Sequence, residues 1–543
     1  MTTATLPRNL MRNFHFPGRS PVLARTAMVA TSHPASTLAA IEMLKSGGNA
    51  VDATIAAVAV QCVVEPQMTG IGGDCFAILW KPGKGKAKGK LIGLNASGRA
   101  PKAATAAWYA KAGIKAIETT SPHAVTVPGA IDGWARLLAD HGTRSLAEVL
   151  APAIEQAEAG YPVTARVAYD WAHLEAKVKL HPGARQHLLI DGKTPKAGDL
   201  VPCKELARTL KLIAKGGRDA FYSGEVAEDM VSELKAMGGL HTLADFAAQS
   251  STYVDPIWVN YQGHDICELP PNLHGIVALI MLNMLKKLGK LDADPTGTQR
   301  YHMLMEAARL AYDARDIFVA DPDMADVPID TMLSDGFAAE LAGRIDPKKR
   351  TENLGPIPEP KGSDTVCLSV ADKDGMVVSF INSVFAGFGS GIVTRKTGIV
   401  LHNRGQGFVL DPKHRNCIGP RKRPLHTLVP AMAMKDGRPS FSFGVMGAAF
   451  QPIGHVYAVT NLLDYGMDPQ EAVDGPRVFF ENGNVEVEQS VPKKTFDGLK
   501  AMGHPVVWRR DPWGGAQMIA FDWEKHLFTG ASDPRKDGMA LGY

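Results

Sequence analysis

Thr365 heads the stretch TVCLSVADKDGMVVSF (365–380), in which two apolar segments flank the turn residues Asp374-Gly375. This pattern predicts a β-hairpin whose first side chain carries a hydroxyl group. A threonine hydroxyl becomes a good nucleophile only beside a base, and the residue's own α-amino group can be that base once the preceding peptide bond is cut. Such a group titrates at about pH 7.7 to 8.0, so a share of it is neutral near pH 7. Thr365 is therefore a candidate N-terminal nucleophile.

The segment before this threonine, IDPKKRTENLGPIPEPKGSD (345–364), is rich in proline, glycine and charge. This composition is typical of an exposed linker, which would let two new chain ends separate after a cut. A plainer interpretation stays open, because threonine is a favoured strand residue and loops often precede strands. The local pattern by itself does not establish catalysis.

Apolar spacing predicts the elements that would position this residue. Apolar residues recur at helical spacing in six segments before residue 345, namely 34–45, 49–64, 129–141, 146–160, 276–287 and 298–316. Strands are predicted at 75–80 and 91–95, a second hairpin at 428–444 and one helix around 455–465. The first two thirds are thus mainly helical, and the last third is rich in strands.

Composition and charge narrow the class of protein. Of 543 residues, 45% are hydrophobic and 21% charged, and 59 basic against 56 acidic residues give a net charge of +3. These values are typical of a folded protein and give no electrostatic reason to expect nucleic acid, so a small-molecule partner is favoured. We find no secretory segment, and the apolar stretch 51–64 is too short and too polar to span a bilayer. We therefore expect a cytoplasmic protein.

Neither the cysteines nor the lysine- and glycine-rich run at 81–90 indicates a binding site. The six cysteines are scattered and show no CxxC spacing, which favours reduced core thiols over disulfides or zinc. The run KPGKGKAKGK (81–90) lacks the phosphate-loop pattern and fits an exposed hairpin tip.

Several longer motifs occur in a recognisable order. They are GGNAVDATIAAVAVQCVVEPQMTGIGGDCFAILW, VTVPGAIDGWARLL, TVCLSVADKDGMVVSF, SVFAGFGSGIV, TGIVLHNRG, RKRPLHTLVPAM and FGVMGAA. In order and spacing they resemble the γ-glutamyltranspeptidase family, from about Met28 to near the carboxy terminus. The resemblance implies an α+β fold, the four-layer αββα sandwich of N-terminal nucleophile hydrolases, made as a proenzyme that cuts itself.

On this chain the implied cut falls between Asp364 and Thr365. It would give a large subunit, 1–364, and a small subunit, 365–543. The two subunits are expected to stay together as one folded heterodimer. Whether heterodimers pair further stays open. Thr365 would attack an amide carbonyl, form an acyl-enzyme and pass the acyl group to water or an amine. No metal or organic cofactor is expected, because nucleophile, base and oxyanion donors all come from the protein.

Three more residues carry over from the family to the catalytic site. Ser383 stands where the family has a threonine that orients the nucleophile's amino group; its alternative is an ordinary surface or core serine. Gly447 and Ala448 stand where two glycines form the oxyanion hole, a role for backbone N–H groups that suits alanine if its φ is negative. The alternative for this pair is a tight strand-to-helix turn, and both interpretations can hold.

The substrate pocket departs from the family pattern. Gly407 replaces the family's acidic residue, which binds the substrate amino group, and Phe385 replaces its asparagine. Arg404 replaces its glutamine, His426-Thr427 its serine pair, and Ser97 its arginine. Arg99 lies two positions after the lost arginine and shares a strand face with it, so its reach to the site stays open.

These departures predict the kind of substrate. A buried ammonium group without a counter-charge is costly, whereas Arg404 can pair with a carboxylate, aided by Arg99. We therefore expect an acyl group that bears a carboxylate but no amine, such as a dicarboxylic monoamide. Arg404 could instead form a structural salt bridge, and His426 beside Thr427 could bind substrate oxygen or only fill space.

The segment between Phe408 and Arg423 is short, and in many family members a longer lid covers the nucleophile there. We expect an open pocket that favours hydrolysis over transfer, similar to the lid-less bacterial branch with oxamate amidohydrolases and cephalosporin-acylase-like enzymes. Two alternatives remain: an ordinary glutathione hydrolase or γ-glutamyltransferase, and an uncleaved binding protein without catalysis.

Overall fold

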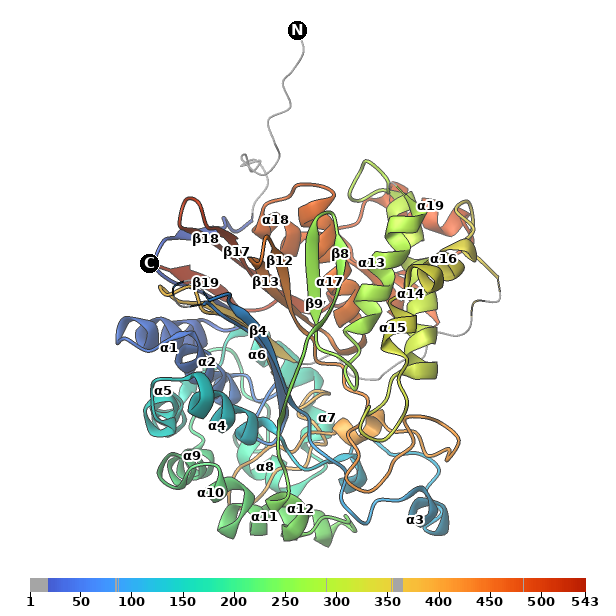
Figure 1. Ribbon diagram of the computed structural model, residues 1–543. Helices are drawn as coiled ribbons and strands as arrows, with labels where there is room; N and C mark the ends of the chain where they lie inside the picture. The colour runs from blue at the N-terminus through green and yellow to red at the C-terminus, as the bar shows by residue number, and fades with distance from the viewer. Residues whose placement is uncertain are drawn as a thin grey trace.

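Two seven-stranded antiparallel sheets form the centre of the molecule (Figure 1). The computed structural model describes residues 18–543 except 84, 86, 290, 353, 355–364 and 482. The first sheet has the order β1 (Val22–Ala24), β18 (Leu527–Ser532), β17 (Gly515–Asp522), β13 (Arg438–Met446), β12 (Pro430–Lys435), β9 (His264–Glu268) and β8 (Ile257–Tyr261). The second has the order β19 (Met539–Gly542), β2 (Met28–Thr31), β10 (Val366–Ala371), β11 (Val377–Ser383), β3 (Asp74–Lys81), β4 (Lys90–Ala96) and β7 (Thr252–Val254).

The two sheets pack face to face, and strand alternation explains how. On β11, Val377 and Ile381 belong to the core between the sheets, whereas Val378 and Phe380 belong to the core under the helices. Side chains on a strand point alternately to opposite faces, so a strand covered on both sides is apolar at nearly every position. This is why the stretch after Thr365 reads as continuously apolar.

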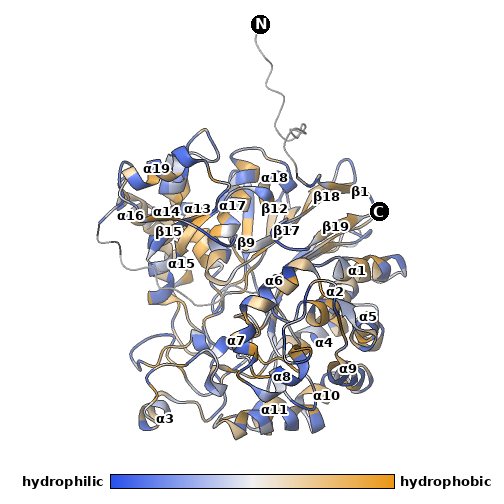
Figure 2. Cartoon of the chain, turned by 180° about the vertical axis from the view of Figure 1, so that it is seen from behind, coloured by the Kyte–Doolittle hydropathy of each residue, from blue (hydrophilic) through white to orange (hydrophobic). Residues whose placement is uncertain are grey.

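Helices cover the outer face of each sheet (Figure 1). The second sheet is covered by α1 (Pro34–Lys45), α2 (Ala50–Val64) and α4 (Ala130–His141), with α5 (Leu146–Ala159) packed on α2 and α9 (Lys204–Gly216) on α5. The first sheet is covered by α13 (Ile276–Leu288) and α17 (Gln451–Leu463), with α14 (Thr298–Phe318) packed on α13. All fifteen residues of α2 are buried, as its apolar sequence predicts, while α9 at the surface mixes hydrophilic and hydrophobic positions (Figure 2). The predicted four-layer αββα sandwich is confirmed.

Most predicted elements occur within one or two residues of their expected bounds. The hairpin β10–β11 turns at Asp374-Gly375, and Gly375 has the positive φ (80°) that such a turn requires. The helix predicted around 455–465 is present as α17, and two helices not predicted from the sequence, α18 (Pro469–Asp474) and α19 (Lys493–Ala501), follow it. Both are short, so apolar spacing marks them weakly. All six cysteines are free thiols, as predicted.

Both sheets combine strands from before and after residue 365. In the second sheet, β10 and β11 lie between β2 and β3, and in the first sheet β12 pairs with β9. Neither part of the chain could complete either sheet alone.

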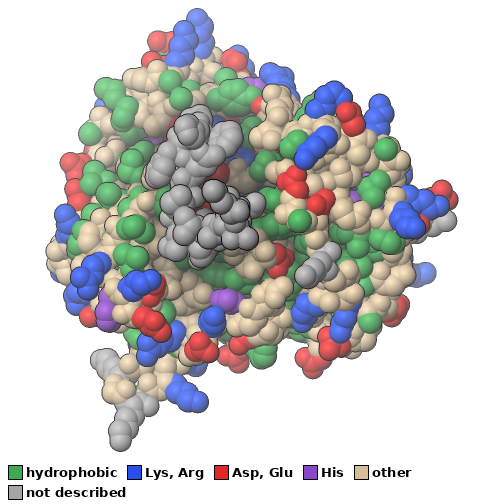
Figure 3. Space-filling view, turned by 90° about the horizontal axis from the view of Figure 1, so that it is seen from above, with side chains coloured by type: hydrophobic (Ala, Val, Ile, Leu, Met, Phe, Trp, Pro, Cys, Tyr) green, Lys and Arg blue, Asp and Glu red, His purple; other side chains and the backbone are tan. Residues whose placement is uncertain are grey.

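The surface offers two further observations. On the face seen in Figure 3, basic and acidic side chains are interspersed, in keeping with the net charge of +3. In the described part of the chain, no helix combines the length and the apolar character needed to cross a membrane.

Candidate active site

Thr365 and Ser383 meet at the open end of the β10–β11 hairpin. Because Val366 pairs with Asn382, the hairpin register brings Thr365 opposite Ser383. Thr365 Oγ1 donates a hydrogen bond to Ser383 Oγ at 3.2 Å, and Ser383 Oγ accepts the Phe385 N–H at 2.7 Å. The hairpin thus brings together two hydroxyl groups that lie 18 residues apart in sequence.

The candidate nucleophile is buried in this single-chain form. Thr365 is 1% exposed, and the open pocket stays a prediction for the chain cut before Thr365. The other predicted cleavage residue, Asp364, lies outside the described residues.

Gly447 and Ala448 form the turn between β13 and α17. Gly447 has φ 126° and ψ 32°, and Ala448 has φ 47°. The condition set for alanine at the oxyanion hole, a negative φ, is therefore not met at Ala448, which begins the short 3-10 helix η4 (Ala448–Phe450) directly after Gly447. A left-handed alanine costs roughly 1–2 kcal/mol, and backbone strain of this kind gathers at functional sites. The predicted strand-to-helix turn is confirmed.

Arg404 is a buried cation, and some of its N–H groups have no acceptor among the described residues. It begins the 3-10 helix η3 (Arg404–Gly407) and is 1% exposed. Nη1 donates to Thr427 Oγ1 at 2.8 Å, and the guanidinium lies 3.9 Å from the centre of the Phe385 ring. Among the described residues, Nε and Nη2 have no hydrogen-bond partner and no carboxylate forms a salt bridge with the guanidinium. Burial lowers the pKa of Arg404 to about 9, which Asp74 partly opposes, so the side chain is charged at neutral pH.

Asp74 supplies the nearby negative charge, and sequence reasoning missed it. It begins β3 opposite Ser383, and it accepts the backbone N–H groups of Gly98 at 2.9 Å and Gly129 at 3.0 Å. Burial alone would raise the pKa of Asp74, but His402, His426 and Arg404 outweigh it and hold the pKa below its usual value. The available signal was an acidic residue at the head of a buried strand, in GIGGDCF.

Both ring nitrogens of His426 form hydrogen bonds within the protein. Its Nε2 donates to Asp74 Oδ2 at 3.0 Å, and its Nδ1 accepts the Leu428 N–H at 3.4 Å. Burial, and then the charge of Arg404, lower the pKa of His426 to about 3, so the ring is neutral. His426 therefore connects Asp74 to the Thr427 segment, while Thr427 holds Arg404.

Comparison with known proteins settles the family. A family model described as Gamma-glutamyltranspeptidase matches residues 36–543. The chain belongs to the γ-glutamyltranspeptidase family. It is 37% identical over 534 residues to the glutathione hydrolase-like YwrD proenzyme of Bacillus subtilis, covering 96% of this chain and 99% of that protein. It is 34% identical over 533 residues to the oxamate amidohydrolase proenzyme of Klebsiella pneumoniae, covering 95% and 98%.

Solved structures agree with this assignment. The crystal structure of cephalosporin acylase from Bacillus halodurans matches with a TM-score of 0.90 and 37% identity, covering 98% of this chain and 99% of that one. These members of the γ-glutamyltranspeptidase family are named hydrolases, amidohydrolases and acylases, and this chain is an N-terminal nucleophile amidohydrolase of the same family.

The position of the lost acidic residue cannot accept a side chain without rearrangement. A Cβ at Gly407 would lie 2.8 Å from the Leu425 carbonyl oxygen. The local packing around residue 407 therefore requires glycine, which is the residue that distinguishes this chain from the γ-glutamyltranspeptidase pattern.

Arg99 lies apart from the other predicted residues. Its Nη1 donates to the Arg421 carbonyl at 3.1 Å and its Nη2 to Asp323 at 3.3 Å, and 22% of its side chain is exposed. Ser97, which replaces the family arginine, is buried and accepts an Asn272 side-chain N–H at 3.3 Å. The structure thus brings Arg404, His426 and Thr427 together, whereas the polar contacts given for Arg99 are with residues outside this group.

Proposed function

We propose that this enzyme cuts its own chain between Asp364 and Thr365 and then hydrolyses amides of a small acyl group that carries a carboxylate and no amine. The observation that carries the substrate class is the Arg404 guanidinium, buried with two nitrogens that lack partners among the described residues. A buried donor without a partner costs about 1–3 kcal/mol, more when charged, and a substrate carboxylate would relieve that cost.

The chemistry follows from the placement of the hydroxyls. After the cut, the Thr365 α-amino group takes the hydroxyl proton, Oγ1 attacks the amide carbonyl, and the amine product leaves. Ser383 orients the nucleophile through the 3.2 Å bond that joins the two oxygens. The backbone N–H groups of the Gly447–Ala448 turn stabilise the oxyanion, although Ala448 lacks the negative φ first required of it, and water releases the acid from the acyl-enzyme.

Charge selects against an amine on the acyl group. The acid of the site, Asp74, already accepts two backbone N–H groups and His426, so it has little capacity left for a substrate ammonium group. An ammonium group next to Arg404 would also be repelled. The oxamate amidohydrolase of Klebsiella pneumoniae is, by its name, an enzyme for such a carboxylate-bearing amide, which supports a dicarboxylic monoamide here.

A matched substrate pair tests this proposal. Glutaryl-p-nitroanilide and γ-glutamyl-p-nitroanilide differ only in the α-amino group, so we expect kcat/KM to favour the glutaryl compound at least tenfold. Oxamate and succinamate then define the chain length. A preference for the γ-glutamyl compound would instead establish the glutathione hydrolase alternative, which the glutathione hydrolase-like relative of Bacillus subtilis supports.

Self-processing is tested separately by intact mass spectrometry of purified protein. The expected result is two fragments, the smaller beginning at Thr365, and an uncut Thr365→Ala variant. A single uncut wild-type chain without turnover would favour the binding-protein alternative.

A further inference from the structure

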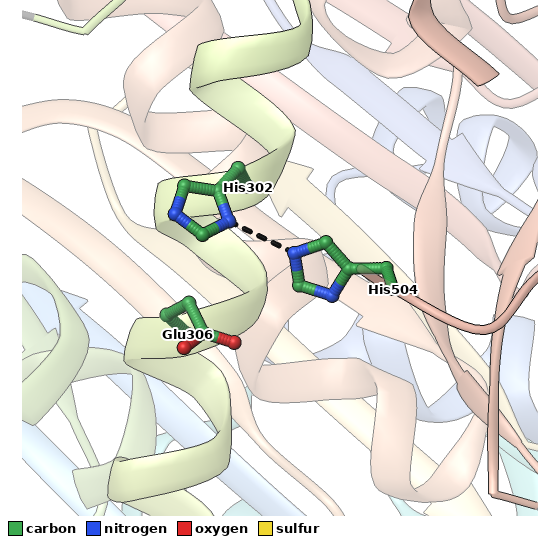
Figure 4. Close-up of side chains that lie close together, drawn as sticks. All are labelled: His302, Glu306 and His504. Carbon is green, nitrogen blue, oxygen red and sulfur yellow. Dashed lines mark hydrogen bonds between the residues drawn. The ribbon is translucent and has the colours of Figure 1, made fainter. Parts of the chain in front are cut away.

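Three buried side chains with metal-binding chemistry converge away from the candidate active site. His302 and Glu306 lie one turn apart on α14, and His504 comes from the segment after α19 (Figure 4). One ligand atom from each lies within 4.8 Å of the others, and His302 Nδ1 is 2.8 Å from His504 Nε2. The i, i+4 spacing on a helix places the first two side chains on one face.

The hydrogen bonds around the cluster hold its ligand atoms in a suitable form. His302 faces the Asp346 carbonyl oxygen with Nε2 at 2.8 Å; this nitrogen must carry the proton, which leaves the lone pair of Nδ1 directed at the cluster. Metal-bound histidines commonly donate their other N–H to a backbone carbonyl in this way. The Glu306 carboxylate is oriented by Arg309 Nη1 at 2.9 Å and by the Thr351 N–H at 2.8 Å.

The second histidine reaches its ligating form by a change of tautomer. His504 is 3% exposed, and because His302 Nδ1 accepts in the pair, His504 Nε2 carries the proton while no ion is bound. Its Nδ1 has no partner among the described residues, so the proton can move to Nδ1 and leave the Nε2 lone pair for an ion. Two bonds of about 2.1 Å to one tetrahedral ion place their nitrogens roughly 3.4 Å apart, so the pair, now at 2.8 Å, must open by about 0.6 Å.

We propose that His302, Glu306 and His504 bind a divalent transition-metal ion of the zinc class. Two imidazoles and one carboxylate suit Zn²⁺, Co²⁺ or Ni²⁺, whereas Mg²⁺ and Ca²⁺ prefer oxygen ligands alone. Arg309 already pairs with the Glu306 carboxylate, so this carboxylate neutralises the charge of the ion only in part. A hydroxide or chloride as exchangeable fourth ligand would neutralise more of it.

The ion would bridge the two fragments of the processed enzyme. His302 and Glu306 precede the proposed cut at residue 364, and His504 follows it. The same cluster also holds the end of the large fragment, through Asp346 to His302 and Thr351 to Glu306. This bridging role rests on the proposed cleavage, but metal binding does not.

The first experiment measures metal content in the full chain without a polyhistidine tag, after growth with zinc and dialysis against chelating resin. We expect about one zinc ion per chain in the wild type and in uncut Thr365→Ala, and an absorbing Co²⁺ complex after exchange. Glu306→Gln and His504→Gln should lose the ion, while His264→Gln, a buried histidine outside the cluster, should keep it. Less than a tenth of a zinc ion per wild-type chain would overturn the site. So would an equal stabilisation of the wild-type fold by Mg²⁺ and by Zn²⁺. Both measurements use the wild type, so they decide the question even if both variants fail to fold.

The second experiment tests the bridge by urea-induced dissociation of the fragments with and without a chelator. The chelator should lower the dissociation midpoint of the processed enzyme more than the unfolding midpoint of uncut Thr365→Ala. Equal effects on both forms would overturn the bridging role. If the wild type is never cut, the metal content still decides the site itself, so the two proposals fail separately.

Discussion

Arg404 is the residue from which substrate selectivity should arise. Arg404→Lys keeps a positive charge but loses the planar fork and the contact with Phe385, 3.9 Å away. We expect kcat/KM for glutaryl-p-nitroanilide to fall about 10- to 100-fold, the equivalent of roughly 1.4–2.8 kcal/mol. The check is steady-state kinetics of fully processed enzyme, with Arg208→Lys at an exposed arginine as control. Unchanged kcat/KM would show that the carboxylate binds elsewhere.

Ala448 tests whether the turn at the proposed oxyanion hole stores strain. Its φ of 47° lies in the left-handed region, where a β-branched side chain fits worse than alanine and glycine fits better. Ala448→Val should lower the free energy of unfolding by about 1–2 kcal/mol, whereas Ala448→Gly should leave it equal or slightly higher. Urea denaturation of the uncut Thr365→Ala background measures both. A stabilising valine would contradict the left-handed conformation.

At the scale of elements, Asp74 ties the start of β3 to three other segments. Its carboxylate joins the backbones at Gly98 and Gly129 to the His426 ring, all inside the protein. Asp74→Asn replaces a charged acceptor with an amide that can accept at only one atom, and it leaves Arg404 without its nearby charge. We expect a loss of about 2–4 kcal/mol in the free energy of unfolding, measured by chemical denaturation.

The matched control is Asp330→Asn, because Asp330 is exposed at the surface. It should change the free energy of unfolding by less than about 0.5 kcal/mol. Equal effects of the two substitutions would mean that Asp74 has no special structural role.

At the scale of the whole molecule, buried histidines make stability depend on pH. Burial lowers the pKa of His241 to about 4 from an ordinary 6.5. The unfolded chain therefore binds more protons than the folded one between these values, and stability falls as pH drops from about 6.5 towards 4. His241 should contribute up to about 3 kcal/mol of this loss.

The measurement compares wild type with His241→Gln by urea denaturation at several pH values. The fall in unfolding free energy between pH 6.5 and pH 4 should be smaller in the variant by about 3 kcal/mol. Parallel curves would show that this histidine is not buried in its neutral form. His33, whose pKa burial also lowers to about 4, follows the same sign.

The parts of the chain before and after residue 365 also depend on each other at this scale. Because β10 and β11 complete the second sheet between β2 and β3, we expect neither 18–364 nor 365–543 to fold cooperatively when expressed alone. The sheet order thus explains why a cut before Thr365 would leave one folded unit.

The sequence by itself determined the family and the layers, and it indicated a candidate nucleophile. Hairpin turns, helix spacing and the order of motifs are local signals, so the hairpin after Thr365 and the helices α2 and α14 followed from them. The link between Thr365 and Ser383 was expected from the family resemblance. The tertiary structure decided what surrounds Thr365. Asp74 and His426 are 352 residues apart in sequence, and their bond exists only because β3 of the second sheet packs against the segment before β12 of the first sheet.

The same reason explains the remaining differences. The positive φ of Ala448 depends on how β13 and α17 are packed, and the position of Arg99 depends on Asp321 and Asp323, more than 200 residues away. Spacing along the chain cannot report contacts between distant segments. It is packing across the two sheets that assembled a buried arginine, its counter-charge and a hydroxyl pair into one candidate site.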